Sequence, residues 1–458
     1  MSETIIARLA EFIATARHDD LPPAMADKAR LHILDTFGAA LAGATSQEAI
    51  RTSAALLRAD GPGQSQLWGS EMRLSPRNAA LVNGIAAHAF ELDDTGGCDH
   101  SGATVLPAVM AALPLADGPV DGRRFTLAVA LGYDIGRRVM MGFGGYVPHN
   151  SAGWHSTGTC GVFAAAAAAA SIMKFDAKAT ANCLGLAASF AGGLWCFIHD
   201  GAMAKRVHAG RAAEGGVLAA LLARDGVTGP AHAFEDVWGG FFKTYAHGPL
   251  TPDAVTNALG RDWLLRDAAI KPYASCRDTH AAIDAIGRVL AREALQPGQI
   301  RHVRARLNSF LNDMVGGRDV STMPAAQMSL PYAVAARLCF GGAGLAAYAP
   351  ERRASPEIAS MLDKVSIEID ETVSASWKSS IIVEADDGRR IEEQTSVQLG
   401  APDNPLPLAQ LRAKFDELAG LVLPAEQARQ LAETVLGLAA LPDARALLPL
   451  LRAGEPTP

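Results

Sequence analysis

The sequence predicts a mainly α-helical protein, with a large helical domain built from both chain ends and a smaller α/β domain between them. Helical spacing of apolar residues dominates the first 261 residues, whereas strand-like runs occur only after about residue 262. Residues 405–452 return to a helical pattern. A chain of 458 residues is also long enough for two domains. We therefore expect a helical segment at 1–261, an α/β domain at 262–400 and a returning helical segment at 401–458.

The first half of the chain is expected to be almost wholly helical. Leu31, Leu34, Phe37 and Leu41 recur at helical spacing. Ser75-Pro76 combines a capping serine with proline at the first helical position, which predicts a helix start. The predicted helices of this part cover 3–17, 24–43, 76–92, 104–116 and 123–142, and Gln66-Leu67-Trp68 is a candidate short strand.

The central helix is predicted at Gly161–Met173, where seven consecutive alanines leave little bulk between neighbouring backbones. Charged and polar residues flank this apolar segment, and charged groups are seldom buried without partners. We expect them to face one pocket; capping of a helix in solvent by Lys205 and Arg206 is the alternative. The flanking residues are His155, Lys205, Arg206 and His208.

A polar loop at 93–102 holds three aspartates, a threonine and a histidine between two apolar helices. Capping of helix ends is one interpretation, and proton transfer by neighbouring carboxylates and histidine is another. Aspartate and histidine are also metal ligands, but the spacing matches neither an EF-hand loop nor a zinc helix motif. We therefore predict no metal site.

The α/β domain is expected to contain a helix that follows Lys271–His280 and ends at Ala294. Asp386-Asp387-Gly388 is a hairpin turn pattern between two strands. The predicted strands are Val303–Leu307, Val365–Ile369, Ser380–Val383 and Glu392–Val397.

Composition excludes several classes of protein. The net charge is −7 and no long basic run occurs, so no nucleic-acid partner is expected. The six cysteines are scattered without a C-x-x-C pair, which favours a reducing cytoplasm over a disulfide scaffold or metal cage. The N-terminus lacks a signal-peptide pattern, and the longest apolar run is too short for a membrane span. Phosphate-loop and dinucleotide-binding motifs are also missing.

Five segments, in order along nearly the whole chain, give the sequence a resemblance to the MmgE/PrpD family. This family includes 2-methylcitrate dehydratases, cis-aconitate decarboxylase and an iminodisuccinate epimerase. Glu91 stands where relatives commonly have aspartate, so its carboxylate reaches one methylene further. The segments are His88–Thr95, Gly153–Thr157, Lys205–Ala213, Lys271–His280 and Ser329–Tyr332.

The resemblance implies a helical domain made from both chain ends, an α/β lid over a cleft near residues 155 and 205, and a homodimer. It also implies catalysis without an organic cofactor, so we expect none. The family's active-site positions fall on Glu91, Thr95, His100, His155, Lys205, His280 and Tyr332.

These residue types suit chemistry at a carbanion-like centre beside a carboxylate, which needs a base, an acid and cations. Lys205, Arg206 and Arg277 are candidate clamps for substrate carboxylates, with His208 and Ser275 as further substrate-binding candidates. His100, His155 and His280 are candidate acid–base groups. Glu91 and Asp94 can orient a histidine or act as a base, and Tyr332 can donate to a developing negative oxygen. Structural roles for His280, Arg277 (helix capping) and Tyr332 (core packing) are the alternatives.

The sequence therefore predicts a cytoplasmic lyase that acts on a small di- or tricarboxylic acid without a cofactor. Dehydration of a 2-methylcitrate-like hydroxy acid is the first hypothesis. Decarboxylation of a cis-aconitate-like acid and epimerisation of an amino-dicarboxylate such as iminodisuccinate are the alternatives within the same site. The non-enzymatic alternative is a protein that has lost activity and serves as a binding module.

Overall fold

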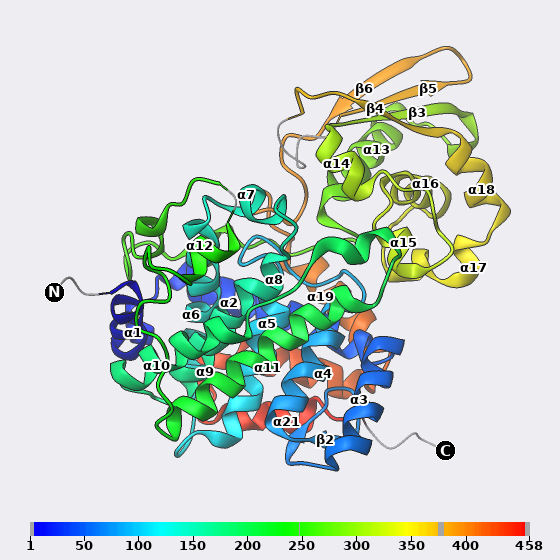
Figure 1. The fold of residues 1–458 in the computed structure, drawn as a ribbon. Helices are drawn as coiled ribbons and strands as arrows, with labels where there is room; N and C mark the ends of the chain where they lie inside the picture. Colours follow the sequence, from blue (N-terminus) through cyan, green and yellow to red (C-terminus); the bar gives the residue numbers. More distant parts are fainter. Residues whose placement is uncertain (1–3, 247, 374–379, 454–458) are drawn as a thin grey trace.

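The computed structural model describes residues 4–246, 248–373 and 380–453. A large helical body fills the lower left of Figure 1, and a smaller part with a four-stranded sheet lies at the upper right. The predicted mainly α fold is confirmed.

The helical body is built first from the N-terminal half of the chain. Ser75 caps α4 (Pro76–His88) by accepting a hydrogen bond from the backbone N–H of Asn78, and Pro76 is the first helical residue, as predicted. A two-stranded hairpin, Ser65–Gln66 (β1) with Arg73–Leu74 (β2), replaces the single strand predicted at 66–68. The principal helices are α1 (Ile5–Thr15), α2 (Pro23–Gly43), α3 (Gln47–Asp60), α4 (Pro76–His88), α5 (Ser101–Ala112), α6 (Gly122–Gly142), α9 (Gly161–Ile172), α10 (Ala177–Ala187) and α11 (Ala204–Arg224). Short helices α7 (Tyr146–Asn150), α8 (Ser156–Thr159) and α12 (Phe241–Tyr245) connect them.

One predicted helix ends earlier than expected. The helix predicted at 76–92 ends at His88, because Glu91 has a φ of 54°, which no residue of a right-handed helix adopts. This break turns residues 89–100 into a loop between α4 and α5.

The alanine-rich helix α9 lies at the centre of the body and packs against α5, α6 and α11. All seven alanines of Ala164–Ala170 are buried. Helix α11 also crosses α4 closely, where a Cβ built on Gly210 would lie 2.2 Å from the carbonyl oxygen of Leu81. This crossing holds the N-terminal end of α11 against the end of α4.

We expect Gly210→Ala to lower the free energy of unfolding by about 1–3 kcal/mol, because the added methyl overlaps backbone that must move. Gly298→Ala is the control, since its Cβ would meet nothing within 4 Å. Urea denaturation of both variants measures the difference. Equal stabilities would contradict a tight α4–α11 crossing.

The α/β part contains one mixed sheet with strand order β4-β3-β5-β6. Strands β3 and β4 are parallel, and the other neighbouring pairs are antiparallel. The strands are β3 (Ile300–Leu307), β4 (Val365–Ile369), β5 (Ser380–Ala385) and β6 (Arg390–Gln394). Helices cover the face that points toward the rest of the molecule (Figure 1): α13 (His280–Glu293), α14 (Ser309–Val315), α16 (Leu330–Phe340) and α18 (Pro356–Asp363), with α15 (Met323–Gln327) and α17 (Pro350–Arg353) beside them.

The four predicted strands and the turn at Asp386-Asp387-Gly388 are confirmed, and one strand lies a few residues earlier than predicted. The strand predicted at 392–397 lies at 390–394, because β6 begins directly after the hairpin turn and pairs Arg390 with Glu384.

The end of the chain returns to the helical body through α19 (Leu408–Ala419), α20 (Ala425–Leu436) and α21 (Leu447–Leu450). Helix α19 packs on α2, where Phe415 contacts the position of Gly38. Both chain ends therefore contribute to one hydrophobic core.

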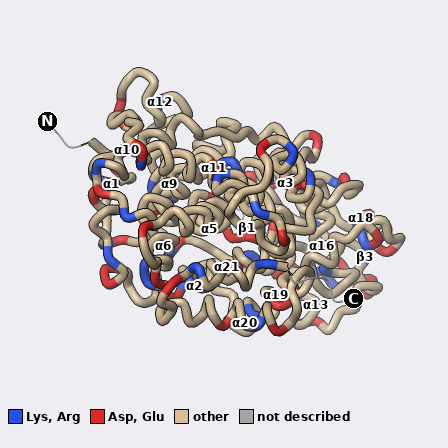
Figure 2. Tube along the Cα trace, turned by 90° about the horizontal axis from the view of Figure 1, so that it is seen from below, with Lys and Arg blue, Asp and Glu red and all other residues tan. Residues whose placement is uncertain are grey.

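The surface carries charged residues of both signs (Figure 2), as the composition of the chain does. Figure 2 shows residues of both charge signs spread around the periphery in that view. All six cysteines are free thiols. Across the described residues, no helix combines the length and hydrophobicity needed to cross a bilayer.

Candidate active site

The candidate site lies where the α4–α5 loop, the first residues of α11 and the α/β part meet. Arg206 on α11 donates to Gln327 on α15 (3.0 Å) and to the carbonyl oxygen of Ala89 (3.3 Å). Gln327 in turn donates to the carbonyl oxygens of Phe90 (2.7 Å) and Ala274 (3.1 Å). These bonds join both parts of the molecule around one buried cluster.

Three cations surround the carboxylate of Glu91. Its Oε1 lies 2.5 Å from Lys205 Nζ and 3.1 Å from Arg206 Nη1, and its Oε2 lies 3.2 Å from Lys271 Nζ. All four side chains are at most 2 % exposed. The alternative in which Lys205 and Arg206 cap a helix in solvent is therefore wrong.

The charges in this cluster determine its protonation. Burial acts to raise the pKa of Glu91, but Lys205, Lys271 and Arg206 outweigh it and hold that pKa well below its usual range. Burial acts to lower the pKa of Lys271, but the carboxylates of Asp93 and Glu91 raise it instead. Glu91 is ionised and Lys271 is protonated at neutral pH.

The pKa of His100 is raised, unlike that of the other histidines of the site. Its Nδ1 lies 2.9 Å from Asp93 Oδ2 and 3.1 Å from the carbonyl oxygen of Asp94. Burial acts to lower the pKa of His100, yet the charges of Asp99 and Asp93 raise it. Such a group can supply a proton to a reacting carbon or leaving oxygen.

His155 is the neutral histidine of the site. It lies before α8, fully buried, with Nδ1 3.0 Å from His208 Nδ1 and Nε2 3.6 Å from Asp99 Oδ2. Burial lowers the pKa of His155 to about 3 and that of His208 to about 4. The Nε2 atom of His155 faces the Asp99 carboxylate and has no hydrogen bond within 3.5 Å among the described residues.

Asp99 joins the two histidines. Its Oδ2 lies 3.6 Å from the Nε2 atoms of both His100 and His155, and its Oδ1 accepts a hydrogen bond from Thr95 (3.2 Å). Asp99 has a φ of 97°, which is rare outside glycine and is often found at functional sites.

Aromatic rings close the site. Lys205 Nζ lies 6.0 Å from the ring centres of both Trp195 and Phe197, and the ring centre of His155 lies 5.1 Å from that of Trp195. Lys205 and His155 are 1 % and 0 % exposed. The cluster is thus closed, and a substrate needs movement of the covering segments to enter.

Several predicted site residues lie at the edge of the cluster. The Asp94 carboxylate accepts hydrogen bonds from Tyr133 and from the Gly102 N–H, and it contacts His32 (3.0 Å). Its side chain therefore fixes the loop against α2, α5 and α6, as the capping interpretation predicts. Thr95 also pairs through its backbone with Ala269.

The α/β side supplies the other predicted residues. Arg277 donates to His280 Nδ1 (3.3 Å) and to the carbonyl oxygen of Leu399 (3.0 Å). Ser275 shares a hydrogen bond with Thr279 (2.8 Å). Tyr332 donates to the carbonyl oxygen of Ala347 (2.5 Å) inside the second hydrophobic core, which favours the packing role.

Sequence reasoning gave no role to His88, Lys271 or Gln327, and it considered Asp93 and Asp99 only as members of the polar loop at 93–102. His88 contacts Asp93 at 3.1 Å, and burial lowers the pKa of His88 to about 3. His88, Asp93 and Lys271 all lie inside segments that carry the family resemblance. Asp99 lies outside those segments but within the polar loop, whereas only its contacts reveal Gln327.

Two residue sets could hold a metal ion by geometry, although the sequence predicts none. Their ligand atoms lie within 4.8 Å of one another: His88, Asp93 and His100 form one set, and Asp99, His100 and His155 the other. Lys271 Nζ, 3.7 Å from Asp93, already places a positive charge beside the first set. The absence of a metal stays a prediction.

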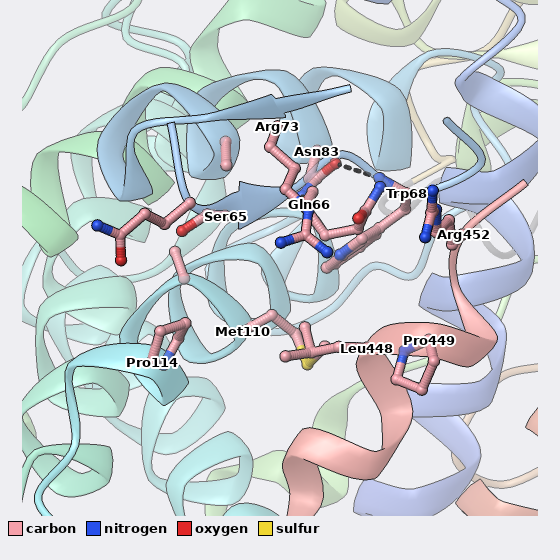
Figure 3. Close-up of a pocket in the computed structure, with 13 residues that line it drawn as sticks. Ser65, Gln66, Trp68, Arg73, Asn83, Met110, Pro114, Leu448, Pro449 and Arg452 are labelled. Atoms are coloured by element: carbon pink, nitrogen blue, oxygen red, sulfur yellow. Dashed lines mark hydrogen bonds between the residues drawn. The ribbon is translucent and has the colours of Figure 1, made fainter. Parts of the chain in front are cut away.

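A separate cavity of about 180 Å³ lies away from this cluster, between β1, α4, α5 and the end of the chain (Figure 3). Asn83 on α4 accepts a hydrogen bond from the N–H of Trp68 (3.0 Å) at its wall. None of the predicted site residues lines this cavity.

The buried neutral histidines predict a pH-dependent stability. Unfolding lets His88 and His155 take up protons below their usual pKa of 6.5, whereas the folded protein keeps both neutral to about pH 3. Their contribution to stability is therefore complete above pH 6.5 and is lost as the pH falls, by about 1.4 kcal/mol per pH unit for each histidine. His100 opposes this trend, because its raised pKa favours folding at lower pH.

Urea denaturation between pH 7 and pH 5 measures this dependence above the usual pKa of carboxylates. We expect the free energy of unfolding to fall with pH, and His155→Gln to reduce the slope. An unchanged slope in His155→Gln would show that His155 is not held neutral in the folded protein.

Comparisons with known proteins show what the whole chain is similar to. The MmgE/PrpD N-terminal domain model matches residues 7–252, and the MmgE/PrpD C-terminal domain model matches residues 273–439. The chain is 29 % identical to the cis-aconitate decarboxylase-like protein oryM of Aspergillus oryzae over 476 residues, covering 98 % of each chain. It is 29 % identical to a cis-aconitate decarboxylase of Aspergillus terreus (99 % of this chain, 97 % of the relative) and 27 % identical to the human one (99 % and 96 %).

Proposed function

The chain belongs to the MmgE/PrpD family, and on this basis we propose that it is a lyase acting on a small di- or tricarboxylic acid. The observation that carries this proposal is one buried cluster that combines Lys205, Arg206 and Lys271 with two histidines whose pKa values are shifted in opposite directions, upward for His100 and downward for His155. Cations of this kind suit an anionic substrate, and the two histidines suit proton transfer in opposite directions.

Decarboxylation of an unsaturated acid of the cis-aconitate type is the reaction we favour, because the curated relatives above carry that activity in their names. The bond between the carboxyl carbon and its neighbour breaks, carbon dioxide leaves, and the electron pair stays on the neighbouring carbon. Lys205 stabilises the developing negative charge, and His100 donates a proton to the carbon.

Dehydration of a 2-methylcitrate-like hydroxy acid, the first hypothesis from sequence, is the second candidate. The buried, neutral imidazole of His155 favours it, because dehydration also needs a base to remove a proton. His100 then protonates the departing hydroxyl. Epimerisation would use the same base and acid without loss of a group. The homodimer and cytoplasmic location expected from sequence belong to this proposal as well.

Proton NMR in deuterated water distinguishes these reactions. Purified, metal-stripped protein is incubated with cis-aconitate, 2-methylcitrate, citrate and a chiral amino-dicarboxylate, with the Lys205→Ala variant as the control. Loss of carbon dioxide identifies a decarboxylase, new vinyl signals from a hydroxy acid identify a dehydratase, and deuterium uptake alone identifies an epimerase. No change with any acid would contradict the proposed function.

A further inference from the structure

Lys414 connects the returning end of the chain with the candidate active site. It lies on α19, and its side chain is 10 % exposed. Its ammonium group donates to Asp35 Oδ1 (2.6 Å) and to the carbonyl oxygens of Leu92 (2.6 Å) and Lys271 (2.7 Å). An ammonium has three N–H donors, so these three bonds use all of them. The group is therefore committed to holding three acceptors in fixed positions.

Two of these acceptors belong to the backbone segments that carry buried charges of the site. Leu92 lies between Glu91 and Asp93, whose carboxylates lie 3.2 Å and 3.7 Å from the Nζ atom of Lys271. Lys414 therefore binds the backbone at both ends of this contact, at the loop that supplies the carboxylates and at the residue that supplies the cation. Its ammonium group constrains how far Lys271 lies from its two carboxylates.

The third acceptor holds the ammonium group in place. Asp35 on α2 is 1 % exposed, and burial raises its pKa although the charge of Lys414 acts against that rise. Asp35 Oδ2 has no hydrogen-bond partner among the described residues. Helices α2 and α19 come from opposite ends of the chain, so this ion pair joins the two ends directly beside the loop that begins after α4.

The packing of α19 on α2 does not depend on this ammonium group. The side chains of α19 that are buried in this packing are apolar, among them Leu411, Phe415 and Leu418. Phe415 contacts the position of Gly38 on α2. Removal of the charge of Lys414 should therefore leave α19 docked, and the docking of the helix and the holding of the loop can be separated by experiment.

We propose that Lys414 is a positioning residue of the active site, which holds Lys271 against the carboxylates of Glu91 and Asp93. It acts through the backbone carbonyl oxygens of Leu92 and Lys271. The part of this inference that concerns turnover rests on the proposed function. The returning segment of the chain then completes the active site as well as the hydrophobic core.

Hydrogen exchange tests the held backbone without a substrate. The two segments that Lys414 holds also pair with each other, through the Thr95 N–H to the Ala269 carbonyl (2.9 Å) and the Ala269 N–H to the Thr95 carbonyl (2.7 Å). In Lys414→Met, which keeps an apolar side chain of similar length, these two amides should exchange at least tenfold faster than in the wild-type protein. The amides of α2 and α19 should keep their wild-type rates. Mass spectrometry of peptides that cover both segments and both helices measures this.

Arg412→Met is the matched control for this measurement. Arg412 is another cation of α19, and it pairs with Asp416 on the same helix at 2.8 Å. Its removal should leave the exchange of Thr95 and Ala269 at the wild-type rate, since it makes no contact with either segment.

A double-mutant cycle tests the effect on turnover, with the acid that proton NMR identifies as the substrate. Lys414→Met should lower kcat/KM at least tenfold in the wild-type background. In a Lys271→Met background it should lower kcat/KM less than threefold, because the cation that it positions is already missing. A lysine that only stabilises the fold would lower turnover by the same factor in both backgrounds.

The outcomes separate this inference from the proposed function. Unchanged exchange at Thr95 and Ala269, or faster exchange throughout α2 and α19, would overturn the positioning role whatever the substrate is. Equal factors in the two backgrounds would overturn it as well. If the wild-type protein converts none of the acids, the proposed function fails, and hydrogen exchange still decides the role of Lys414. If Lys414→Met does not fold, Asp35→Asn is added to remove the unpaired buried carboxylate, and Asp35→Asn alone is then the reference.

Discussion

Lys205→Ala is expected to lower kcat/KM about 10²–10⁴-fold. Lys205 Nζ lies in a closed, aromatic-walled site, where a positive charge stabilises a developing negative charge far more than it would in water. Arg206 and Lys271 still hold Glu91 in this variant, so the protein should still fold, with a lower melting temperature because Glu91 loses one of its buried partners.

Two further variants are compared with Lys205→Ala to test the role of its charge and the specificity of the loss. Lys205→Arg keeps the charge and should recover part of the activity if electrostatics dominates. Lys243→Ala removes an exposed lysine that pairs with Asp236, and should leave turnover unchanged. Wild-type turnover in Lys205→Ala would remove this residue from the mechanism.

Arg206→Met is expected to produce the largest loss of stability, about 3–5 kcal/mol in the free energy of unfolding. The guanidinium is 1 % exposed and contacts the Glu91 carboxylate, the Gln327 amide and the carbonyl oxygen of Ala89. Removing it leaves three buried acceptors with fewer donors and breaks a direct link between the helical body and the α/β part.

Urea denaturation of Arg206→Met beside Arg429→Met measures the effect of burial. Arg429 pairs with Glu426 and Glu433 on the surface of α20 and is 50 % exposed, so its loss should change stability by less than about 1 kcal/mol. Similar losses in both variants would mean that the buried network contributes no more than a surface ion pair.

Local patterns alone predicted most of the fold. The apolar spacing of Leu34, Phe37 and Leu41 predicted α2, the Ser75-Pro76 pair predicted the start of α4, and Asp386-Asp387-Gly388 predicted the hairpin between β5 and β6. These features depend on residues a few positions apart, so they can be recognised in the sequence itself.

The site was predicted only in part. His155, Lys205 and Arg206 stood out as polar residues beside an apolar helix, and the structure buries them together. Lys271 and Gln327 did not stand out, because their partners lie more than 100 positions away. No local pattern encodes such pairs.

The sequence by itself determined the helices, the strands and the residue types available for chemistry, because these follow from local periodicity and side-chain identity. Only the tertiary structure decided which residues act together and in what protonation state. His100 and His155 are the same residue type, yet two carboxylates raise the pKa of the first and burial lowers that of the second. That difference arises from desolvation and from charges brought together by folding, which a linear sequence does not contain.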